Sequence, residues 1–310
     1  MDMYQKRKLR KEQKEQKERE NKNGTYVPIS WYPGHMLKAK NDIKDSLKLI
    51  DIVVEILDSR IPKSSSNNSI NEFSNNKKKI VVLNKIDLAD EKQTLKWKKY
   101  FESQDITVVL TDSNNKNNIK QLLDTIRKVG ATLEKYKNKS IEVKPIYRVL
   151  IVGIPNVGKS TIINKLSNKQ SANVGNRPGV TTKKQWIRLG SDIELLDTPG
   201  LLWPKLDEDN AGVKLALTGN IKQEILDVEN LANEGIKIIM QNEKSLMLLK
   251  EKYNLTEEDL KLESYEVLEL IGRKRGCIAK GNEVDFEKVS KLFLDELKNG
   301  KIGKISLDYV

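Results

Sequence analysis

The chain has 310 residues, of which 37% are hydrophobic and 32% are charged, and it is long enough for one α/β domain and a smaller second domain. Its single cysteine excludes an intramolecular disulfide and a cysteine-based metal cage, and its single histidine removes most zinc sites as well. The formal net charge of +12 predicts a polyanionic partner, with nucleic acid in first place, although a lysine-rich solvated surface would carry the same charge.

Residues 1–30 begin with a polar, basic run that contains almost no aliphatic side chains. Such a segment cannot bury a core, and we expect it to be a basic, disordered arm. It lacks the apolar region of a signal peptide, and no apolar run of the chain reaches the roughly 18 residues that cross a bilayer. We therefore expect a cytoplasmic protein with no membrane partner.

Predicted strands and helices alternate over residues 31–218, which we assign to one domain. Two of the strands flank a turn at Gly190-Ser191. Alternation of this kind predicts a mostly parallel sheet covered on both faces, with ligands bound beyond the carboxyl ends of the strands. Buried-looking strands are expected to end at Asp58, at Asn84, at Leu110, before Gly153 and at Asp197, and one long helix is expected over residues 119–139.

Helical periodicity replaces the strand pattern over residues 219–310, which we predict to be a small all-helical domain. Within it, Arg273, Lys274 and Arg275 form a basic cluster that either contacts RNA phosphates or is simply solvated. Helical segments are expected at residues 221–241, 245–253, 256–262, 264–276 and 285–300.

A phosphate-binding pattern lies between a predicted strand and a predicted helix. The segment GIPNVGKST, from Gly153 to Thr161, fits G-x-x-x-x-G-K-[ST], in which glycines let the backbone wrap around phosphates at a helix N-terminus. In this pattern Lys159 neutralises the β- and γ-phosphates, and the Ser160 hydroxyl is a ligand of Mg²⁺. The nucleotide-binding residues expected here are Asn156, Val157, Gly158, Lys159, Ser160 and Thr161.

Two further segments complete the predicted phosphate site. ELLDTPG places Asp197 at a strand end, where its carboxylate can hold the hydration shell of Mg²⁺, and the Gly200 N–H can sense the γ-phosphate. RPGVTTKK has the composition of a switch loop, in which Thr181 is the expected ligand of Mg²⁺ and of the γ-phosphate, with Thr182 as the alternative.

Asn84, Lys85 and Asp87 in VVLNKIDLAD decide between ATP and GTP. The Asp87 carboxylate can accept hydrogen bonds from N1–H and the N2 amino group of guanine, whereas adenine has no donors at those positions. Asn84 can contact N7, and the stem of Lys85 can pack over the ring. We therefore predict GTP and GDP as ligands.

The base motif precedes the phosphate loop by about 70 residues, which reverses the order found in ordinary small GTPases. A parallel sheet tolerates this order because the strands keep their places while only the connections change. The permutation also places DTPG directly before the helical domain, so the nucleotide state can move that domain with little intervening chain.

From about Trp31 to the C-terminus, the chain resembles the circularly permuted GTPases of the ribosome biogenesis GTPase A family. The resemblance rests on WYPGHM, DSRIPKSS, LNKIDLAD, GIPNVGKS, PGVTT, DTPG and LALTGNIK, and more loosely on RKRGCIAKGNEVD and NGKIGKISLD. It implies an α/β P-loop GTPase domain with a mostly parallel sheet and permuted motif order, followed by a small all-helical C-terminal domain that binds RNA or the ribosome. It also implies hydrolysis of GTP to GDP and phosphate during late assembly of the large ribosomal subunit, through contact with rRNA.

The resemblance also bears on catalysis and cofactors. The family lacks the glutamine that positions water in Ras-like proteins, and Leu201 follows DTPG here. His35 of PGHM is the family's candidate catalytic residue, because a neutral imidazole can orient water, while capping of the first helix or rRNA contact is the alternative. Asn156 resembles a P-loop asparagine that binds K⁺ in some GTPases of this class, which implies K⁺ as an activator alongside Mg²⁺.

Other interpretations stay open at this stage. The main alternative is a GTP-regulated RNA-binding module in which hydrolysis is incidental, and a non-ribosomal GTPase of a related permuted family is a third. We expect a monomer away from the ribosome. Asp58, Arg60 and Pro62 follow a predicted strand and either order the nucleotide-side loops or form a structural turn. Trp97, Trp186 and Trp203 are expected to be packing residues, and Cys277 to be structural or inert.

Overall fold

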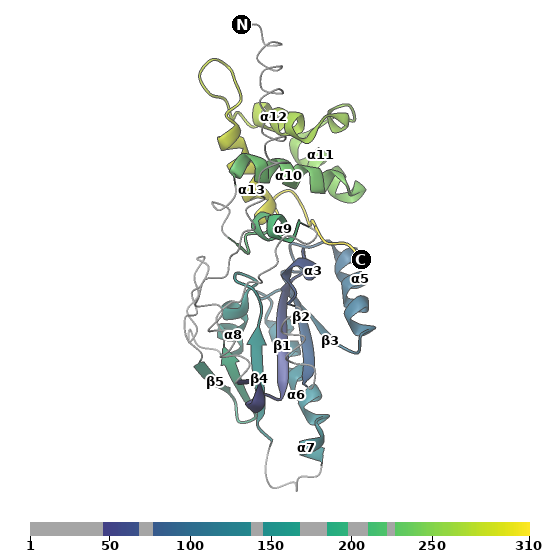
Figure 1. The fold of residues 1–310 in the computed structure, drawn as a ribbon, viewed down its shortest axis with the longest axis vertical. Helices are drawn as coiled ribbons and strands as arrows, with labels where there is room; N and C mark the ends of the chain where they lie inside the picture. The colour runs from purple at the N-terminus through teal and green to yellow at the C-terminus, as the bar shows by residue number, and fades with distance from the viewer. Residues whose placement is uncertain (1–45, 68–76, 138–144, 168–184, 198–209, 222–226) are drawn as a thin grey trace, which may run out of the picture.

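The computed structural model describes residues 46–67, 77–137, 145–167, 185–197, 210–221 and 227–310. Within these residues a sheet domain and a group of helices follow one another along the long axis of the molecule (Figure 1). None of the described helices is both long and apolar enough to cross a bilayer.

The described strands form one sheet in the order β3-β2-β1-β4-β6-β5. β1, β2, β3, β4 and β6 are parallel, and β5 is antiparallel to β6. The expected mostly parallel sheet is therefore confirmed, as is the expected turn at Gly190, which has a φ of 60°. The strands are β1 (Ile52–Asp58), β2 (Lys78–Asn84), β3 (Thr107–Thr111), β4 (Tyr147–Val152), β5 (Gln185–Leu189) and β6 (Ile193–Asp197).

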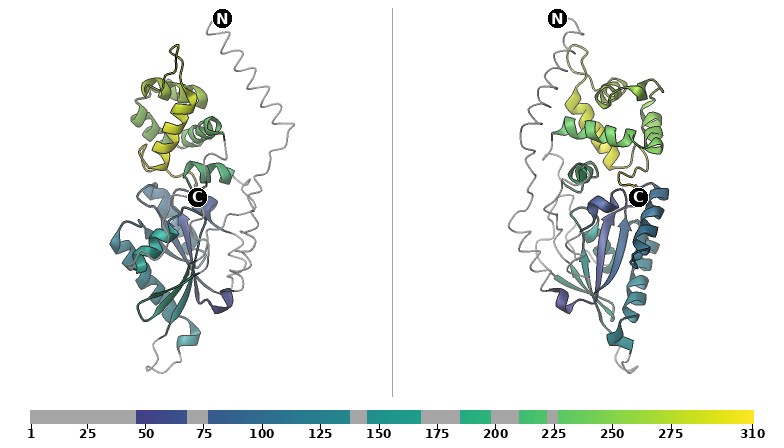
Figure 2. Two further views of the ribbon diagram at one scale, coloured as in Figure 1. Left: turned by 90° about the vertical axis from the view of Figure 1, so that its left-hand side faces the viewer. Right: turned by 45° about the vertical axis from the view of Figure 1, so that its right-hand side comes forward.

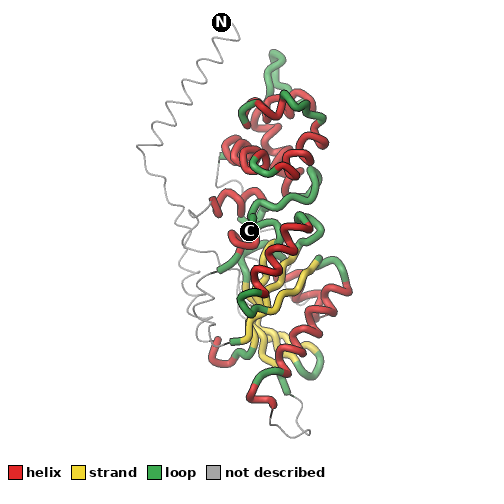
Figure 3. Tube along the Cα trace, turned by 90° about the vertical axis from the view of Figure 1, so that its right-hand side faces the viewer, coloured by secondary structure: helices red, strands yellow, loops and turns green. Residues whose placement is uncertain are grey.

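Successive residues of β1 face opposite sides of the sheet, and both sets are buried. Val54 and Ile56 belong to the core beneath α6 (Lys116–Ala131) and α8 (Lys159–Ser167). Leu57 packs instead with Trp97 and Phe101 of α5 (Glu91–Glu102) on the other face. Helices cover both faces, as the continuous Val, Ile and Leu runs of these strands predict. Figure 3 shows these helices in red around the yellow sheet.

The break after α6 departs from the sequence prediction. α6 ends at Ala131, and the short α7 (Glu134–Lys137) follows. The prediction of one continuous helix over residues 119–139 is therefore wrong, because the described part of this range, residues 119–137, contains two helices. The Tyr136 ring packs edge-on against Tyr147 of β4, with centroids 5.3 Å apart, and the Tyr136 hydroxyl donates to the Ile146 carbonyl at 2.7 Å. Turning the chain after Ala131 brings Tyr136 onto β4, so tertiary packing overrides the local helical pattern.

The C-terminal part is mostly helical, as expected, but the helix expected over residues 221–241 begins only at Val228 within the described residues. The segment expected as a helix at residues 256–262 contains only a 3-10 turn, η4 (Asp259–Lys261). An isolated antiparallel bridge joins Ile278 to Val284 between two of the helices. The helices are α9 (Ala211–Leu217), α10 (Val228–Met240), α11 (Glu243–Tyr253), α12 (Ser264–Lys274) and α13 (Phe286–Lys298). The described residues also contain the short elements η1 (Leu47–Leu49) and α3 (Pro62–Ser65).

Helices α9 to α13 lie over the carboxyl edge of the sheet, and α9 lies between the sheet and the other four (Figure 2). α9 contacts α3 on the sheet side and α10 and α13 on the helical side. The C-terminal tail then returns to the sheet domain, where the Leu307 N–H donates to the Arg60 carbonyl at 2.7 Å and the Trp97 indole donates to the Asp308 carbonyl at 3.2 Å. Both α9 and the tail therefore join the two parts of the chain.

Candidate functional site

The predicted nucleotide motifs meet at one edge of the sheet. Asp58 and Asn84 are register partners at the ends of β1 and β2, and Asn84 is in turn the partner of Thr111 at the end of β3. Ile151 of β4, which leads into the phosphate loop, pairs with Asp197 at the end of β6. Because these strands are parallel, their carboxyl ends form a single edge, which is where ligands bind in such sheets.

The phosphate loop adopts a conformation that its glycines make possible. Gly158 has a φ of 104°, and a Cβ added there would lie 2.3 Å from Asn84 Nδ2. Asn156 is in the left-handed region, with a φ of 58°. Val157 is fully buried, and Thr161 lies in the first turn of α8, which begins at Lys159. The backbone N–H groups of a loop and helix start such as these are suited to bind phosphate oxygens.

Lys159 is held in place by the phosphate loop itself. Its side chain is buried, and Nζ donates to the Ile154 carbonyl at 2.8 Å, which closes the loop on itself. Burial lowers the pKa of this ammonium to about 8, against an opposing effect of the Asp197 charge. A bound phosphate would favour the charged form, so ligand binding and protonation of Lys159 are linked.

The donors expected to hold Mg²⁺ fit that ion by their chemistry. Asp197 is a fully buried carboxylate that acts electrostatically on Lys159, and Ser160 is the next residue along the loop. A carboxylate and a hydroxyl beside a phosphate site are the oxygen donors that Mg²⁺ prefers. Thr181, the third expected ligand, lies outside the described residues.

The base motif and the phosphate loop are bonded to one another. The Asn84 amide donates Nδ2–H to the Val157 carbonyl at 2.7 Å. An amide carries two N–H groups, so this bond leaves the second one for guanine N7. Gly158 allows the approach, because any side chain there would collide with Asn84.

Lys85 and Asp87 follow Asn84 on the turn after β2. Lys85 has a left-handed backbone with a φ of 62°, and its ammonium donates to Asp58 at 2.9 Å. Asp87 lies on the same turn and is partly exposed to solvent. Partial burial and the neighbouring Asp112 charge raise the pKa of Asp87. Asp112 belongs to the loop after β3, so this loop lies near the carboxylate expected to read guanine.

Several expected site residues lie outside the described part of the chain. These are His35, Thr181 and Gly200, together with Thr182, Leu201 and Trp203. Their roles remain predictions.

The sequence pattern did not predict the contacts that connect the site to the helical part. Asn156 donates Nδ2–H to the Gly219 carbonyl at 3.0 Å, just after α9. Asn220 donates to Asp58 at 3.1 Å, and Arg60 donates to the Thr218 carbonyl at 2.9 Å. The motifs DSRIP and LALTGNIK were a weak signal that these segments matter. Nothing in the sequence indicates that two segments so far apart are in contact.

The basic cluster of α12 is engaged inside the molecule. Arg273 pairs with Glu269 at 2.9 Å, Lys274 with Asp259 at 3.7 Å, and Arg275 with Glu296 at 2.6 Å. Neither interpretation of this cluster, RNA contact or simple solvation, included these ion pairs within the molecule. Cys277, next to it, is buried, in agreement with a structural role.

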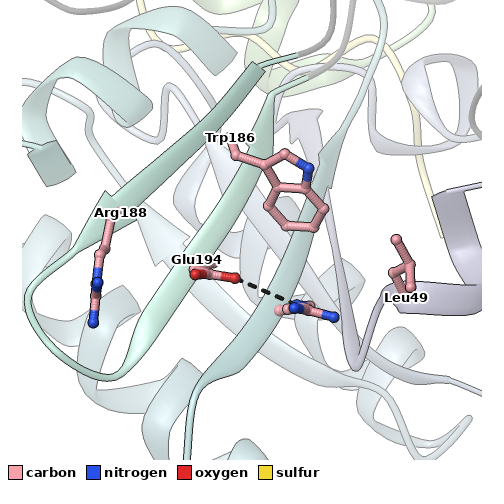
Figure 4. A pocket seen from close by; sticks show the side chains of 5 residues that line it. Leu49, Trp186, Arg188 and Glu194 are labelled. Carbon is pink, nitrogen blue, oxygen red and sulfur yellow. Dashed lines mark hydrogen bonds and ion pairs between the residues drawn. The ribbon is translucent and has the colours of Figure 1, made fainter.

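A pocket of about 320 Å³ lies away from the nucleotide motifs. Arg148 and Glu194 are register partners near the beginning of β4 and β6, at the opposite end of these strands from the phosphate loop. Figure 4 shows the Trp186 indole and the Leu49 side chain on two sides of this hollow. Trp186 is 46% exposed on β5, the edge strand of the described sheet, so the packing role expected for it is wrong. The lining residues are Leu49, Arg148, Trp186, Arg188 and Glu194.

Comparison with known proteins agrees with this geometry. Residues 148–272 match the family described as 50S ribosome-binding GTPase, and residues 49–207 match the family described as RsgA GTPase. The chain is 40% identical to ribosome biogenesis GTPase A of Bacillus pumilus over 91% of this chain and 99% of the relative. It is 42% identical to ribosome biogenesis GTPase A of Priestia megaterium over 91% and 97% of the two chains.

Solved structures of similar fold indicate the same family. The crystal structure of GNP-bound YlqF from Thermotoga maritima is 31% identical, with a TM-score of 0.61 over 88% of this chain and 98% of that one. The GDP-bound structure of YlqF is 30% identical, with a TM-score of 0.62 over 86% and 98%. These likenesses span the sheet, the phosphate loop and the C-terminal helices together. The chain is therefore a GTP-binding GTPase of ribosome biogenesis and belongs to the ribosome biogenesis GTPase A family.

Proposed function

We propose that this GTPase acts in late assembly of the large ribosomal subunit, which it contacts through rRNA. The net charge of +12 supports a polyanionic partner. The match of residues 148–272 to a family described as 50S ribosome-binding GTPase favours the large subunit as that partner. In this proposal the protein is a cytoplasmic monomer that binds the particle with GTP and leaves after hydrolysis to GDP and phosphate.

The observation that carries the proposal is the bond from Asn156 to the Gly219 carbonyl, 3.0 Å long. It joins the phosphate loop directly to the residues that lead into the helical part. A change at the γ-phosphate therefore has a short path to helices that can contact RNA.

The residues of the phosphate site have distinct tasks in hydrolysis. The loop N–H groups and Lys159 bind the β- and γ-phosphates and offset negative charge as the bond to the γ-phosphate breaks. Ser160, Asp197 and Thr181 would hold Mg²⁺, which supplies further charge neutralisation at the phosphate oxygens when bound. Gly200 would contact the γ-phosphate, and Asn84, Lys85 and Asp87 would hold the guanine.

Water activation and cation dependence are assigned to two further residues. His35 would orient the attacking water, since no glutamine follows DTPG. The amide nitrogen of Asn156 is engaged by Gly219, which leaves its side-chain oxygen to hold K⁺. Replacing K⁺ by Na⁺ should then slow hydrolysis without weakening GDP binding, and equal rates in the two salts would reject the K⁺ role.

Sedimentation of the protein with purified large subunits tests the partner. Co-sedimentation should require a non-hydrolysable GTP analogue, should be lost with GDP, and should not occur with small subunits. Binding that is equal for both subunits, or equal in both nucleotide states, would overturn the proposed partner.

Single-turnover hydrolysis separates the proposal from the alternative RNA-binding module. Large subunits should accelerate hydrolysis if it is part of the release step. RNA binding without any acceleration would favour the module in which hydrolysis is incidental. Substitution His35→Ala should remove the acceleration and leave the GTP affinity unchanged, whereas an unchanged accelerated rate would reject the catalytic role of His35.

A further inference from the structure

The Asp58 carboxylate, fully buried at the end of β1, binds donors from three separate parts of the chain. Arg60 donates Nε–H to Oδ1 at 3.0 Å and Nη2–H to Oδ2 at 2.8 Å. Lys85 of the base motif donates Nζ–H to Oδ2 at 2.9 Å. Asn220, beyond α9, donates Nδ2–H to the same oxygen at 3.1 Å. One carboxylate thus joins the base motif to the residues that lead into the helical part.

Asp58 remains ionised in this setting. Burial alone would raise the pKa of this carboxyl, but the charges and hydrogen bonds of Arg60 and Lys85 outweigh burial and hold the pKa well below its usual range. Arg60 and Lys85 would repel one another without the carboxylate between them. The position of the Lys85 ammonium therefore depends on Asp58.

The backbone of Lys85 gives this dependence a consequence for the site. Its left-handed conformation, with a φ of 62°, is one that a lysine adopts only where its surroundings hold it. Among the described residues, it is held by the bond to Asp58 and by the bond from the Leu88 N–H to the Lys85 carbonyl at 3.0 Å. Asp87 follows on the same turn, so the conformation of Lys85 decides where the Asp87 carboxylate meets guanine.

The network also reaches the helical part through backbone carbonyls. Arg60 donates Nη2–H to the Thr218 carbonyl and Nη1–H to the Lys298 carbonyl, both at 2.9 Å. Asn220 donates to the Thr218 hydroxyl at 2.8 Å. Arg60 and Asn220, which both bind the Asp58 carboxylate, therefore also contact the end of α9, and Arg60 contacts the end of α13 as well.

We propose that Asp58 is a positioning residue for guanine recognition and that it acts through Lys85. The inference rests on the proposed assignment of Asn84, Lys85 and Asp87 as the base site. Asp58 does not touch the base, because it is fully buried behind Lys85, whose side chain is 20% exposed. Its loss should weaken binding of the guanine base and spare binding of phosphates at the loop.

The test compares GDP with tripolyphosphate, which occupies the phosphate loop but has no base. Each ligand competes with a fluorescent GDP analogue on the full-length protein. Asp58→Asn should weaken GDP binding by about tenfold or more, the size expected for a lost charged hydrogen bond, and change tripolyphosphate binding by less than about twofold. Equal weakening of both ligands, as a merely structural lesion would produce, overturns the inference.

Asp308→Asn is a matched control. Asp308 is another buried carboxylate at the junction with the helical part, where it binds Lys214 at 2.8 Å and the Ser64 N–H at 2.7 Å, and it does not contact the base motif. Asp308→Asn should lower the melting temperature but leave the ratio of GDP to tripolyphosphate affinity unchanged. A ratio that falls as far as in Asp58→Asn would show that any buried lesion at this junction has the same effect, and would overturn the inference.

A double-mutant cycle tests whether Asp58 acts through Lys85. Once Lys85→Met has removed the ammonium, adding Asp58→Asn should weaken GDP binding no further. Full additivity of the two losses would overturn the inference.

Asp87→Asn separates failure of the base site from failure of the role of Asp58. An unchanged GDP affinity in that variant would reject the base site itself. If Asp58→Asn shows no melting transition, Asn220→Ala, which removes only the neutral donor, should lower GDP affinity more than tripolyphosphate affinity, and equal losses would overturn the inference.

Discussion

Asn84 and Val157 lie 73 residues apart in the chain, and the Asn84 amide donates to the Val157 carbonyl at 2.7 Å. This bond makes the base motif and the phosphate loop one structural unit despite their permuted order. The carbonyl that accepts it belongs to a buried residue, so it has no access to water as a substitute partner.

Substitution Asn84→Ala should therefore damage both stability and binding. It leaves the Val157 carbonyl without its donor, and we expect a loss of about 1–3 kcal/mol in the free energy of unfolding. GDP affinity should also fall, because guanine loses its contact at N7. Urea unfolding and GDP titration measure the two effects. Asn117→Ala, at an exposed position of α6, is the control and should change neither the stability nor the GDP affinity. An Asn84→Ala variant as stable as this control would contradict the prediction.

Gly158→Ala should be far more harmful than Gly276→Ala, although both glycines have a positive φ, of 104° and 65°. A Cβ at Gly158 would meet Asn84 Nδ2 at 2.3 Å, whereas a Cβ at Gly276 has nothing within 4 Å. The control carries only the backbone strain of about 1–2 kcal/mol. Gly158→Ala adds the collision and should lose GDP binding. Similar GDP affinities in the two variants would show that the approach of Asn84 to the loop is not needed.

GDP binding should take up protons near pH 8 through Lys159. The pKa of its buried ammonium is about 8 in the free protein, and a bound diphosphate favours the charged form and raises this pKa. Binding at pH 8 should then take up about half a proton, falling toward zero well below pH 7, and the affinity should decline as the pH rises above 8. Calorimetry in two buffers of different ionisation enthalpy measures the uptake. No uptake at pH 8 would mean that Lys159 is already fully charged before GDP binds.

Trp97 and Trp186 should respond oppositely to replacement by alanine. Trp97 is buried against Phe101 and its indole donates to the Asp308 carbonyl, so Trp97→Ala should cost about 3–5 kcal/mol in the free energy of unfolding. Trp186 is exposed, with the Arg148 guanidinium 5.9 Å from its ring centroid, and Trp186→Ala should cost less than about 1 kcal/mol. Thermal or urea unfolding of the two variants measures the difference. Comparable losses would contradict the exposure of Trp186.

Local patterns were sufficient to predict the nucleotide motifs and the strands that carry them. The strand ends at Asp58, Asn84 and Asp197 agree with the structure because continuous Val, Ile and Leu runs are typical of strands buried on both faces. The phosphate loop follows β4 and precedes α8 for a similar reason, since its glycines, lysine and serine are adjacent in the chain. Parallel pairing then brings these strand ends to one edge without further information.

Only the tertiary structure decided how that edge is tied to the helical part. Asp58 meets Asn220 across 162 residues, and Ser64 meets Asp308 across 244 residues. Trp186 and Trp97 have the same side chain, yet Trp186 is exposed on the edge strand of the described sheet and Trp97 is buried beneath the C-terminal tail. Burial and long-range hydrogen bonding depend on which segments meet in space, and sequence periodicity reports only on neighbours within a few turns. The sequence by itself therefore determined the parts of a GTP site, whereas their connection through Asp58 and the C-terminal tail was decided by the fold.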